Sequence, residues 1–294
     1  MTNHIFGVID VGSNSVRLLI SNRGQTVFKF ATITRLSLGM TKDKILNKQS
    51  IKRTIDALSF FKDKAINEFK VEKLFIFATA GVRYAKNKEE FLKEVKNNLG
   101  MDVDVVSGDI EAEIGALGAL NGNDGGFIDV GGKSTEIVYV AGGKHVYTTS
   151  LNIGVVTLTE KFGQDVDKIK SYCSNFIKEN VVKLPVKTDK FVCVGGTATT
   201  LASISLLIKE YDYKIVDGYV LSKEKSCDII NELKNIPVED RLEKYCIQPG
   251  REDIILSGAI LINELLKYFS LNKIVVRDCD NLEGYLIKKG VFYD

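Results

Sequence analysis

The sequence predicts an α/β protein built from two similar domains, and three observations support this. Its 294 residues exceed what one ordinary hydrophobic core accommodates. Short apolar runs that end in glycine turns are interspersed with amphipathic patterns along the whole chain, as strands and helices of an α/β protein are. The third observation is an internal repeat.

The repeat begins with residues 7–15, GVIDVGSNS, which return as residues 126–134, GFIDVGGKS. In each copy an apolar strand ends in an aspartate, Asp10 or Asp129, and a turn of small residues comes directly after it. A second apolar run, a glycine turn and a third β-rich run come next in both copies. This agreement in residue type, order and spacing predicts two copies of one βββ unit, one per domain.

Helical patterns come after each unit and define the expected domains. The first domain is expected to comprise residues 1–121, completed by a C-terminal helix at about 279–294. The second is expected to comprise residues 122–278. The first long helix is predicted to start at a capping Ser50 and to continue to Phe69.

Composition narrows the function classes. A net charge of +2 is close to neutral, so an anionic ligand must be held by a local cluster, and no DNA or RNA partner is expected. No apolar run approaches the ~20 residues that span a bilayer, and no signal peptide is indicated. The cysteines are scattered and form no CxxC pair, which predicts a reducing, cytoplasmic location and no disulfide framework or zinc site; they are Cys173, Cys193, Cys227, Cys246 and Cys279.

Three glycine-rich turns at the ends of strands are candidate phosphate loops. Glycine permits close backbone approach, and exposed N–H groups together with hydroxyls can hold phosphate oxygens. The third turn also opens a helix, whose N-terminus favours an anion. None fits the nucleotide-binding patterns GxxxxGK[ST] or GxGxxG. The loop residues are Gly12, Ser13, Asn14 and Ser15, then Gly131, Gly132, Lys133 and Ser134, then Gly195, Gly196 and Thr197.

Several motifs around these turns resemble one family. They are DVGSNSVRL (10–18), ATAGVRYAKN (78–87), SGDIEA (107–112), DVGGKSTE (129–136), SLNIG (150–154), VGGTA (194–198) and REDIILSG (251–258). Along essentially the whole chain the sequence resembles the exopolyphosphatase / guanosine pentaphosphate phosphatase (Ppx/GppA) family, in its short two-domain form. That family belongs to the actin, Hsp70 and sugar-kinase superfamily.

The resemblance implies two RNase H-like domains of the actin-like ATPase fold, with the active site in the cleft between them. It also implies a hydrolase of acid anhydrides that releases terminal phosphate from inorganic polyphosphate or converts pppGpp to ppGpp. Mg²⁺, or another divalent cation, is the expected cofactor, and a homodimer is the expected assembly.

The resemblance further assigns roles to residues. The catalytic carboxylates would be Glu111, which orients or deprotonates the attacking water, and Glu136 near the terminal phosphate. The acids that bind the metal would be Asp10 and Asp129. The arginines that contact the anionic ligand would be Arg17 and Arg251, with Arg83 as a further candidate. Taken alone, each residue also fits an ordinary role, such as a turn-capping aspartate, a solvated helix glutamate or an arginine paired with a nearby acid.

Two departures from the family pattern bear on function. Lys133 stands where the family usually has a third glycine; it would strain the turn if that position needed positive φ, or its ammonium could reach a phosphate. Many members carry further C-terminal helical domains, so this shorter chain is expected to prefer short polyphosphates or a nucleotide pentaphosphate. A catalytically weak polyphosphate or alarmone sensor and an ATP-dependent small-molecule kinase are the alternative functions.

Overall fold

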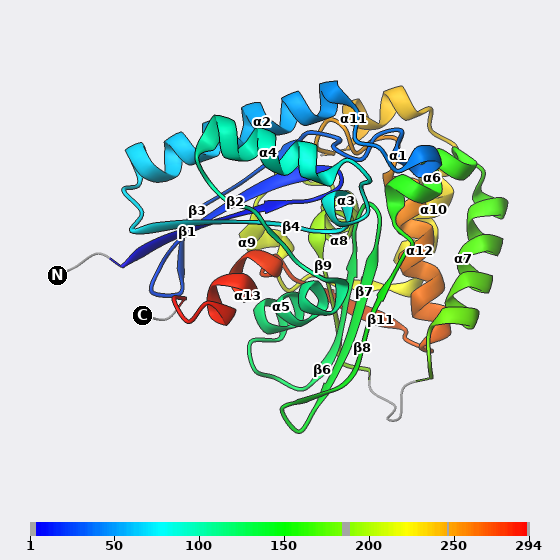
Figure 1. The fold of residues 1–294 in the computed structure, drawn as a ribbon. Coiled ribbons are helices and arrows are strands. Elements are labelled where there is room, and N and C mark those ends of the chain that lie inside the picture. Colours follow the sequence, from blue (N-terminus) through cyan, green and yellow to red (C-terminus); the bar gives the residue numbers. More distant parts are fainter. Residues whose placement is uncertain (1–3, 184–188, 246, 293–294) are drawn as a thin grey trace. The chain divides into compact units, whose positions relative to one another are not determined.

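The computed structural model describes residues 4–183, 189–245 and 247–292, and the chain divides into two compact units. The first unit contains the residues up to Gly118 together with those from Asp280 onward. The second runs from Ala119 to Cys279 and is therefore inserted into the first along the sequence. Each unit contains one β-sheet flanked by helices, which confirms the predicted α/β class (Figure 1).

The sheet of the first unit has the strand order β3-β2-β1-β4-β5. The first three strands form an antiparallel meander, and β4 and β5 run parallel to β1. Their bounds are β1 Ile5–Val11, β2 Ser15–Asn22, β3 Gln25–Ile33, β4 Lys73–Ala78 and β5 Asp104–Val105.

Helices cover both faces of this sheet, because β1 and β2 present apolar side chains to both sides. On one face Ile9 and Leu18 join a core with α2 and α4; on the other, Val8 and Leu19 join a core with α5 and α13. The helices of the first unit are α1 Met40–Asp43, α2 Lys48–Asp63, α3 Ala80–Arg83, α4 Lys88–Leu99, α5 Gly108–Leu120 (which ends in the second unit) and α13 Asn281–Lys288.

The second unit repeats this topology. Its sheet has the order β10-β11-β9-β6-β7-β8, in which β8-β7-β6-β9-β11 corresponds to the five strands of the first unit. The meander β6-β7-β8 is antiparallel, β9 and β11 are parallel to β6 and to each other, and β10 adds an antiparallel edge. The strands are β6 Gly125–Val130, β7 Thr135–Ala141, β8 Lys144–Leu151, β9 Phe191–Val194, β10 Val220–Ser222 and β11 Lys273–Val276.

One large core holds the second unit together. Ile128 and Ile137 from the sheet pack with helix residues such as Leu201, Ile229 and Leu261. The helices are α6 Val155–Phe162, α7 Val166–Asn180, α8 Gly195–Leu206, α9 Tyr213–Val216, α10 Lys223–Lys234, α11 Arg241–Lys244 and α12 Ile255–Tyr268.

The predicted start of the first long helix was wrong by a few residues. Asn47 caps α2, its side chain accepting a hydrogen bond from the Ser50 backbone N–H at 2.8 Å. Ser50 lies inside the helix, buried, and its hydroxyl donates to the Arg35 carbonyl. The segment expected to continue the helix to Phe69 changes to a π-helical turn at Lys64–Glu68.

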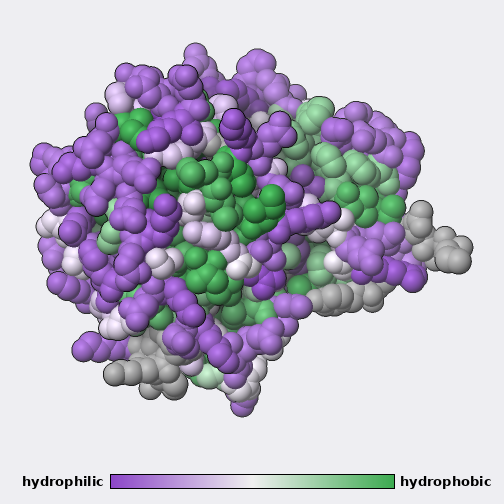
Figure 2. Space-filling view, turned by 180° about the vertical axis from the view of Figure 1, so that it is seen from behind, coloured by the Kyte–Doolittle hydropathy of each residue, from purple (hydrophilic) through white to green (hydrophobic). Residues whose placement is uncertain are grey.

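Hydrophilic residues make up most of the face seen in Figure 2, with apolar residues gathered in smaller areas. Within the described ranges, no helix is both long and apolar enough to cross a membrane. Cys173, Cys193, Cys227 and Cys279 form no disulfide with one another, and Cys246 lies outside the described residues.

Candidate functional site

The first candidate phosphate loop connects β1 to β2 in the first unit. Its backbone closes through a hydrogen bond from the Gly12 N–H to the Ser15 carbonyl at 2.9 Å. The segment after β3 holds the loop from outside, because the Ser37 N–H donates to the Ser13 carbonyl and two further N–H groups donate to the Asn14 carbonyl. Carbonyls thus anchor the turn to the rest of the unit.

Glu111 lies in the first turn of α5 and is 6% exposed. The Arg83 guanidinium donates to its carboxylate at 2.8 Å and also to the Val106 carbonyl at 3.0 Å. Burial raises the pKa of Glu111 to about 7, against the opposing effects of Arg83 and of a hydrogen bond from Thr79; the charge of Asp10 raises it further. Such a carboxyl can exchange a proton near neutral pH, as a general base requires.

Arg17 is held between two carboxylates. It lies directly opposite Asp10 in the β1–β2 register, and its Nε donates to Asp10 Oδ2 at 3.0 Å. A second guanidinium nitrogen forms an ion pair with Asp280, the residue that caps α13. Burial raises the pKa of Asp10, and the neighbouring Arg17 opposes that rise. The arginine predicted to contact a ligand anion therefore also organises the acids of its own unit.

The second loop connects β6 to β7 in the second unit and repeats the geometry of the first. The Gly131 N–H donates to the Ser134 carbonyl at 3.0 Å, as Gly12 does to Ser15. The first N–H groups of α6 donate to the Gly131 and Gly132 carbonyls. A side chain at Gly154 would meet the Gly132 backbone at 2.5 Å, so this close packing requires glycine there.

Lys133 does not strain this loop. It is not among the non-glycine residues with positive φ, so the conformational penalty considered from the sequence does not arise. Lys133 is buried, and its ammonium lies 3.4 Å from the Glu160 carboxylate on α6. Burial lowers the pKa of Lys133, while Glu160 acts in the opposite direction. A cation therefore stands within the second loop, where the family pattern has glycine.

The third loop brings together Asp129, the start of α8 and Arg251. Gly195 has φ +79°, and a side chain there would meet the Asp129 carboxylate at 2.5 Å. A side chain at Gly196 would overlap the Arg251 guanidinium. The Thr197 hydroxyl donates to the Val130 carbonyl at 2.8 Å, which fixes the helix start against β6. Val194, the residue before α8, provides no side-chain cap for the helix.

Glu136 is 1% exposed and accepts a hydrogen bond from the Ser150 hydroxyl at 2.6 Å. It lies opposite Asp129 in the β6–β7 register, the same place that Arg17 takes opposite Asp10. The equivalent positions of the two units therefore hold an aspartate opposite an arginine in the first unit and an aspartate opposite a glutamate in the second. Two buried acids that face each other across neighbouring strands favour a cation between them.

The predicted site residues fall in both units, and several of their hydrogen-bond partners were not predicted. Asp280 on Arg17, Thr79 on Glu111 and Ser150 on Glu136 were not predicted. The pattern Asp280-x-x-Glu283 does predict a helix N-cap. Its contact with Arg17, 263 residues away, has no counterpart in the sequence pattern.

Comparison with known proteins places this geometry in a family. The model of the Ppx/GppA phosphatase family matches residues 18–293. The chain is 32% identical to a bifunctional 3-dehydroquinate synthase/phosphatase of Fusobacterium nucleatum, over 97% of this chain and 46% of that protein. It is 28% identical to a guanosine-5'-triphosphate,3'-diphosphate pyrophosphatase of Vibrio atlanticus, over 99% of this chain and 59% of that protein. The chain thus spans about half the length of these curated relatives.

A solved structure extends the agreement to the fold. The Aquifex aeolicus PPX-GPPA enzyme is 33% identical and superposes with a TM-score of 0.79, and the match covers 97% of this chain and 99% of that one. The family model and the Aquifex aeolicus structure both match almost the whole sequence. This chain belongs to the Ppx/GppA phosphatase family.

Proposed function

We propose that this chain hydrolyses phosphoanhydride bonds, releasing the terminal phosphate of inorganic polyphosphate or converting guanosine pentaphosphate to the tetraphosphate. The observation that carries the proposal is Glu111, a buried carboxyl whose pKa is raised to about 7, in the same unit as the first glycine loop. The names of the relatives, a guanosine pentaphosphate pyrophosphatase among them, support the same reaction class.

In this reaction Glu111 accepts the proton of the attacking water or orients that water. Arg83 holds the carboxylate through its hydrogen bond and keeps the pKa of Glu111 from rising further. The glycine loops, with Lys133 and Arg251, would bind the phosphate oxygens and offset their charge. Glu136, buried and hydrogen-bonded to Ser150, would act close to the terminal phosphate.

The residues present fit a bound Mg²⁺. Asp10 is 3% exposed, and its Oδ1 has no hydrogen-bond partner among the described residues, as a cation ligand would. Mg²⁺ is usually held by one or two carboxylates together with water and substrate phosphates, so a buried carboxylate of this kind is a suitable ligand. Asp10 in the first unit and Asp129 in the second are the carboxylates that would serve as Mg²⁺ ligands, and bound Mg²⁺ would neutralise charge on the phosphates.

The test is phosphate release by the purified protein with Mg²⁺, with short polyphosphate and pppGpp assayed side by side. We expect release from at least one substrate and its loss in Glu111→Gln. The matched control is Glu113→Gln, because Glu113 lies on the same helix, is partly exposed and pairs with Lys288. Tight binding without release in the unmodified protein would contradict hydrolysis and favour the sensor function.

Phosphorylation of a small acceptor by ATP would instead favour the kinase. Cytoplasmic location and a homodimer stay predictions. The oligomeric state can be measured by size-exclusion chromatography with light-scattering detection.

A further inference from the structure

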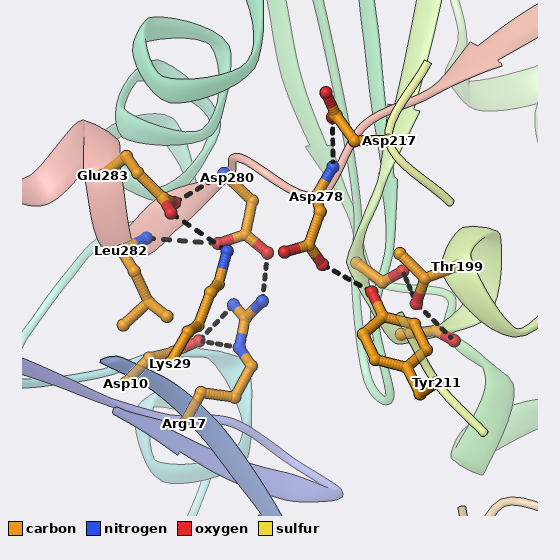
Figure 3. Close-up of polar contacts among 12 residues, drawn as sticks. Asp10, Arg17, Lys29, Thr199, Tyr211, Asp217, Asp278, Asp280, Leu282 and Glu283 are labelled. Carbon is orange, nitrogen blue, oxygen red and sulfur yellow. Dashed lines mark hydrogen bonds and ion pairs between the residues drawn. The ribbon is translucent and has the colours of Figure 1, made fainter. Parts of the chain in front are cut away.

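A cluster of charged residues in the first unit surrounds Asp10 and includes a residue that the proposed mechanism does not use. Arg17 Nε and a second Arg17 nitrogen both donate to Asp10 Oδ2, at 3.0 and 2.5 Å. The remaining guanidinium nitrogen is directed to Asp280 Oδ2 (Figure 3). Both carboxylate side chains are 4% exposed, so these charges interact largely shielded from water.

The fold fixes Asp280 in this place. Its Oδ1 accepts a hydrogen bond from the Leu282 N–H, and its own N–H donates to Glu283, which completes a capping box at the start of α13. Glycines let α13 approach α5 closely, because a side chain at Gly118 would overlap the Asp280 carbonyl. Asp280 therefore divides its two oxygens between the helix cap and Arg17.

The other charged groups around the cluster form ion pairs, and the charge of Lys29 also acts on Asp280. Lys29 forms an ion pair with Glu283 at 3.0 Å, and Arg83 forms one with Glu111 at 2.8 Å. Asp10 and Arg17 would also cancel if they were alone. Asp280 offsets the charge of Arg17, so the group of Asp10, Arg17 and Asp280 keeps one net negative charge.

Geometry adds to this charge effect. An arginine facing one carboxylate tends to bind both of its oxygens with two parallel N–H donors. Here Asp280 holds one Arg17 nitrogen, and the other two donors converge on Asp10 Oδ2. Asp10 Oδ1, which is buried, is left without a hydrogen bond among the described residues.

We propose that Asp280 is a positioning residue that, by holding Arg17, keeps one Asp10 oxygen and one negative charge available for a divalent cation. The inference rests on the proposed function, which assigns the cation to Asp10. It adds that cation affinity in this chain depends on a residue at the start of its last helix.

The experiment titrates Mn²⁺ into the phosphate-free protein and follows the loss of the free-ion signal by electron paramagnetic resonance. Asp280→Asn keeps an Oδ1 acceptor for the Leu282 N–H and loses the charge that faces Arg17. We expect Mn²⁺ binding weaker by about tenfold. Asp104→Asn is the matched control, since it makes the same exchange at a partly exposed carboxylate that binds Tyr285 of α13 and does not touch Arg17. We expect it to bind Mn²⁺ as the unmodified protein does.

A double variant tests the charge argument. Arg17→Gln with Asp280→Asn leaves Asp10 with one net negative charge again, so we expect affinity to return to within about threefold of the unmodified protein. Circular dichroism establishes that each variant is folded. Equal Mn²⁺ binding by the unmodified protein and Asp280→Asn, including no binding by either, overturns the proposal.

A loss in Asp104→Asn as large as that in Asp280→Asn also overturns the proposal, because it would show an effect that does not depend on Arg17. Because the titration needs no turnover, absence of phosphate release would refute the proposed reaction without changing this result.

Discussion

At the scale of single residues, the Glu111 carboxyl is both buried and able to ionise near neutral pH, although burial normally disfavours ionisation. Burial removes its carboxylate from water and raises its pKa, while Arg83 supplies the charge that allows ionisation near neutral pH. Natural active sites accept such unfavourable burial because it provides a base with a suitable proton affinity. The raised pKa of Glu111 should affect both the pH dependence of hydrolysis and the stability of the protein.

Hydrolysis should depend on pH through Glu111. If this carboxyl must be ionised, kcat/KM rises with pH with a midpoint of about 7 and is flat above it. Arg83 lowers the pKa of Glu111, so Arg83→Gln should move the midpoint to higher pH. The measurement is kcat/KM between pH 5.5 and 9 for both proteins on one substrate. If the midpoint were the same in Arg83→Gln, the pH dependence would not come from the ion pair between Glu111 and Arg83.

Stability should depend on pH through the same group. The pKa of Glu111 is raised on folding from 4.5 to about 7, so the native state binds the proton more tightly than the unfolded chain, and stability falls as pH rises between these values. Above pH 7 the buried charge costs on the order of 3 kcal/mol. Glu111→Gln should therefore raise the melting temperature at pH 8 and change it little at pH 4.5. Equal changes of the melting temperature at both pH values would contradict a raised pKa of Glu111 as the cause of the pH dependence.

The residues of the site differ in how far sequence could reveal them. Asp10, Asp129 and the glycine loops lie within short contiguous motifs that local patterns reveal, whereas the role of Glu111 was assigned by resemblance to the family. Asp280 contributes through an ion pair with a residue at the other end of the chain, so only the fold reveals it. Lys133 was recognised as unusual, but the absence of strain depends on its backbone conformation, which composition does not encode.

At the scale of elements, close crossing of α5 and α13 links Glu111 to the last helix. Glycines stand on both sides of the crossing, and a side chain at Gly284 would overlap the Ile114 carbonyl, as one at Gly118 would overlap that of Asp280. Neither glycine has positive φ, so packing and not backbone conformation requires glycine at these positions. The glycines of helix interiors therefore carry a structural role that their low helix propensity would not suggest.

Gly284→Ala should force the two helices apart. We expect a loss of about 3 kcal/mol in the free energy of unfolding, measured by urea denaturation, because a backbone carbonyl already occupies the space that the methyl group needs. Lys288→Ala is the control on the same helix, where only a partly exposed ion pair with Glu113 is lost and a change below about 1 kcal/mol is expected. Similar losses in both variants would contradict the packing argument.

Elements with strong apolar patterns were predictable, and short ones were not. The strands that carry Asp10 and Asp129 are almost wholly buried, and their apolar runs mark them. Helix α6, Val155–Phe162, was missed because its first N–H groups are satisfied by the carbonyls of Gly131 and Gly132 instead of a capping side chain. Such a cap is formed by tertiary contact and leaves no local sequence signal.

At the scale of the whole molecule, the internal repeat predicted one βββ unit per domain, and each sheet contains one, β1-β2-β3 and β6-β7-β8. The repeat covers only the meander of each sheet, so the parallel strands and the edge strand β10 depend on residues outside the repeat. The chain also returns to the first unit after completing the second. This return makes the first unit depend on the last residues of the described chain.

Removing the residues after Cys279 should unfold the first unit and spare the second. Leu282, Tyr285 and Leu286 of α13 pack on Val8, Leu19 and Phe77, and each buried side chain contributes about 2 kcal/mol. Their loss approaches the whole stability of a typical domain, whereas the core of the second unit contains none of these residues. Hydrogen exchange on the shortened chain should show protection lost in β1, β2 and β4 and kept in β6, β7 and β9. Protection retained in β1 would mean that the other face of this sheet, covered by α2 and α4, suffices to hold the first unit together.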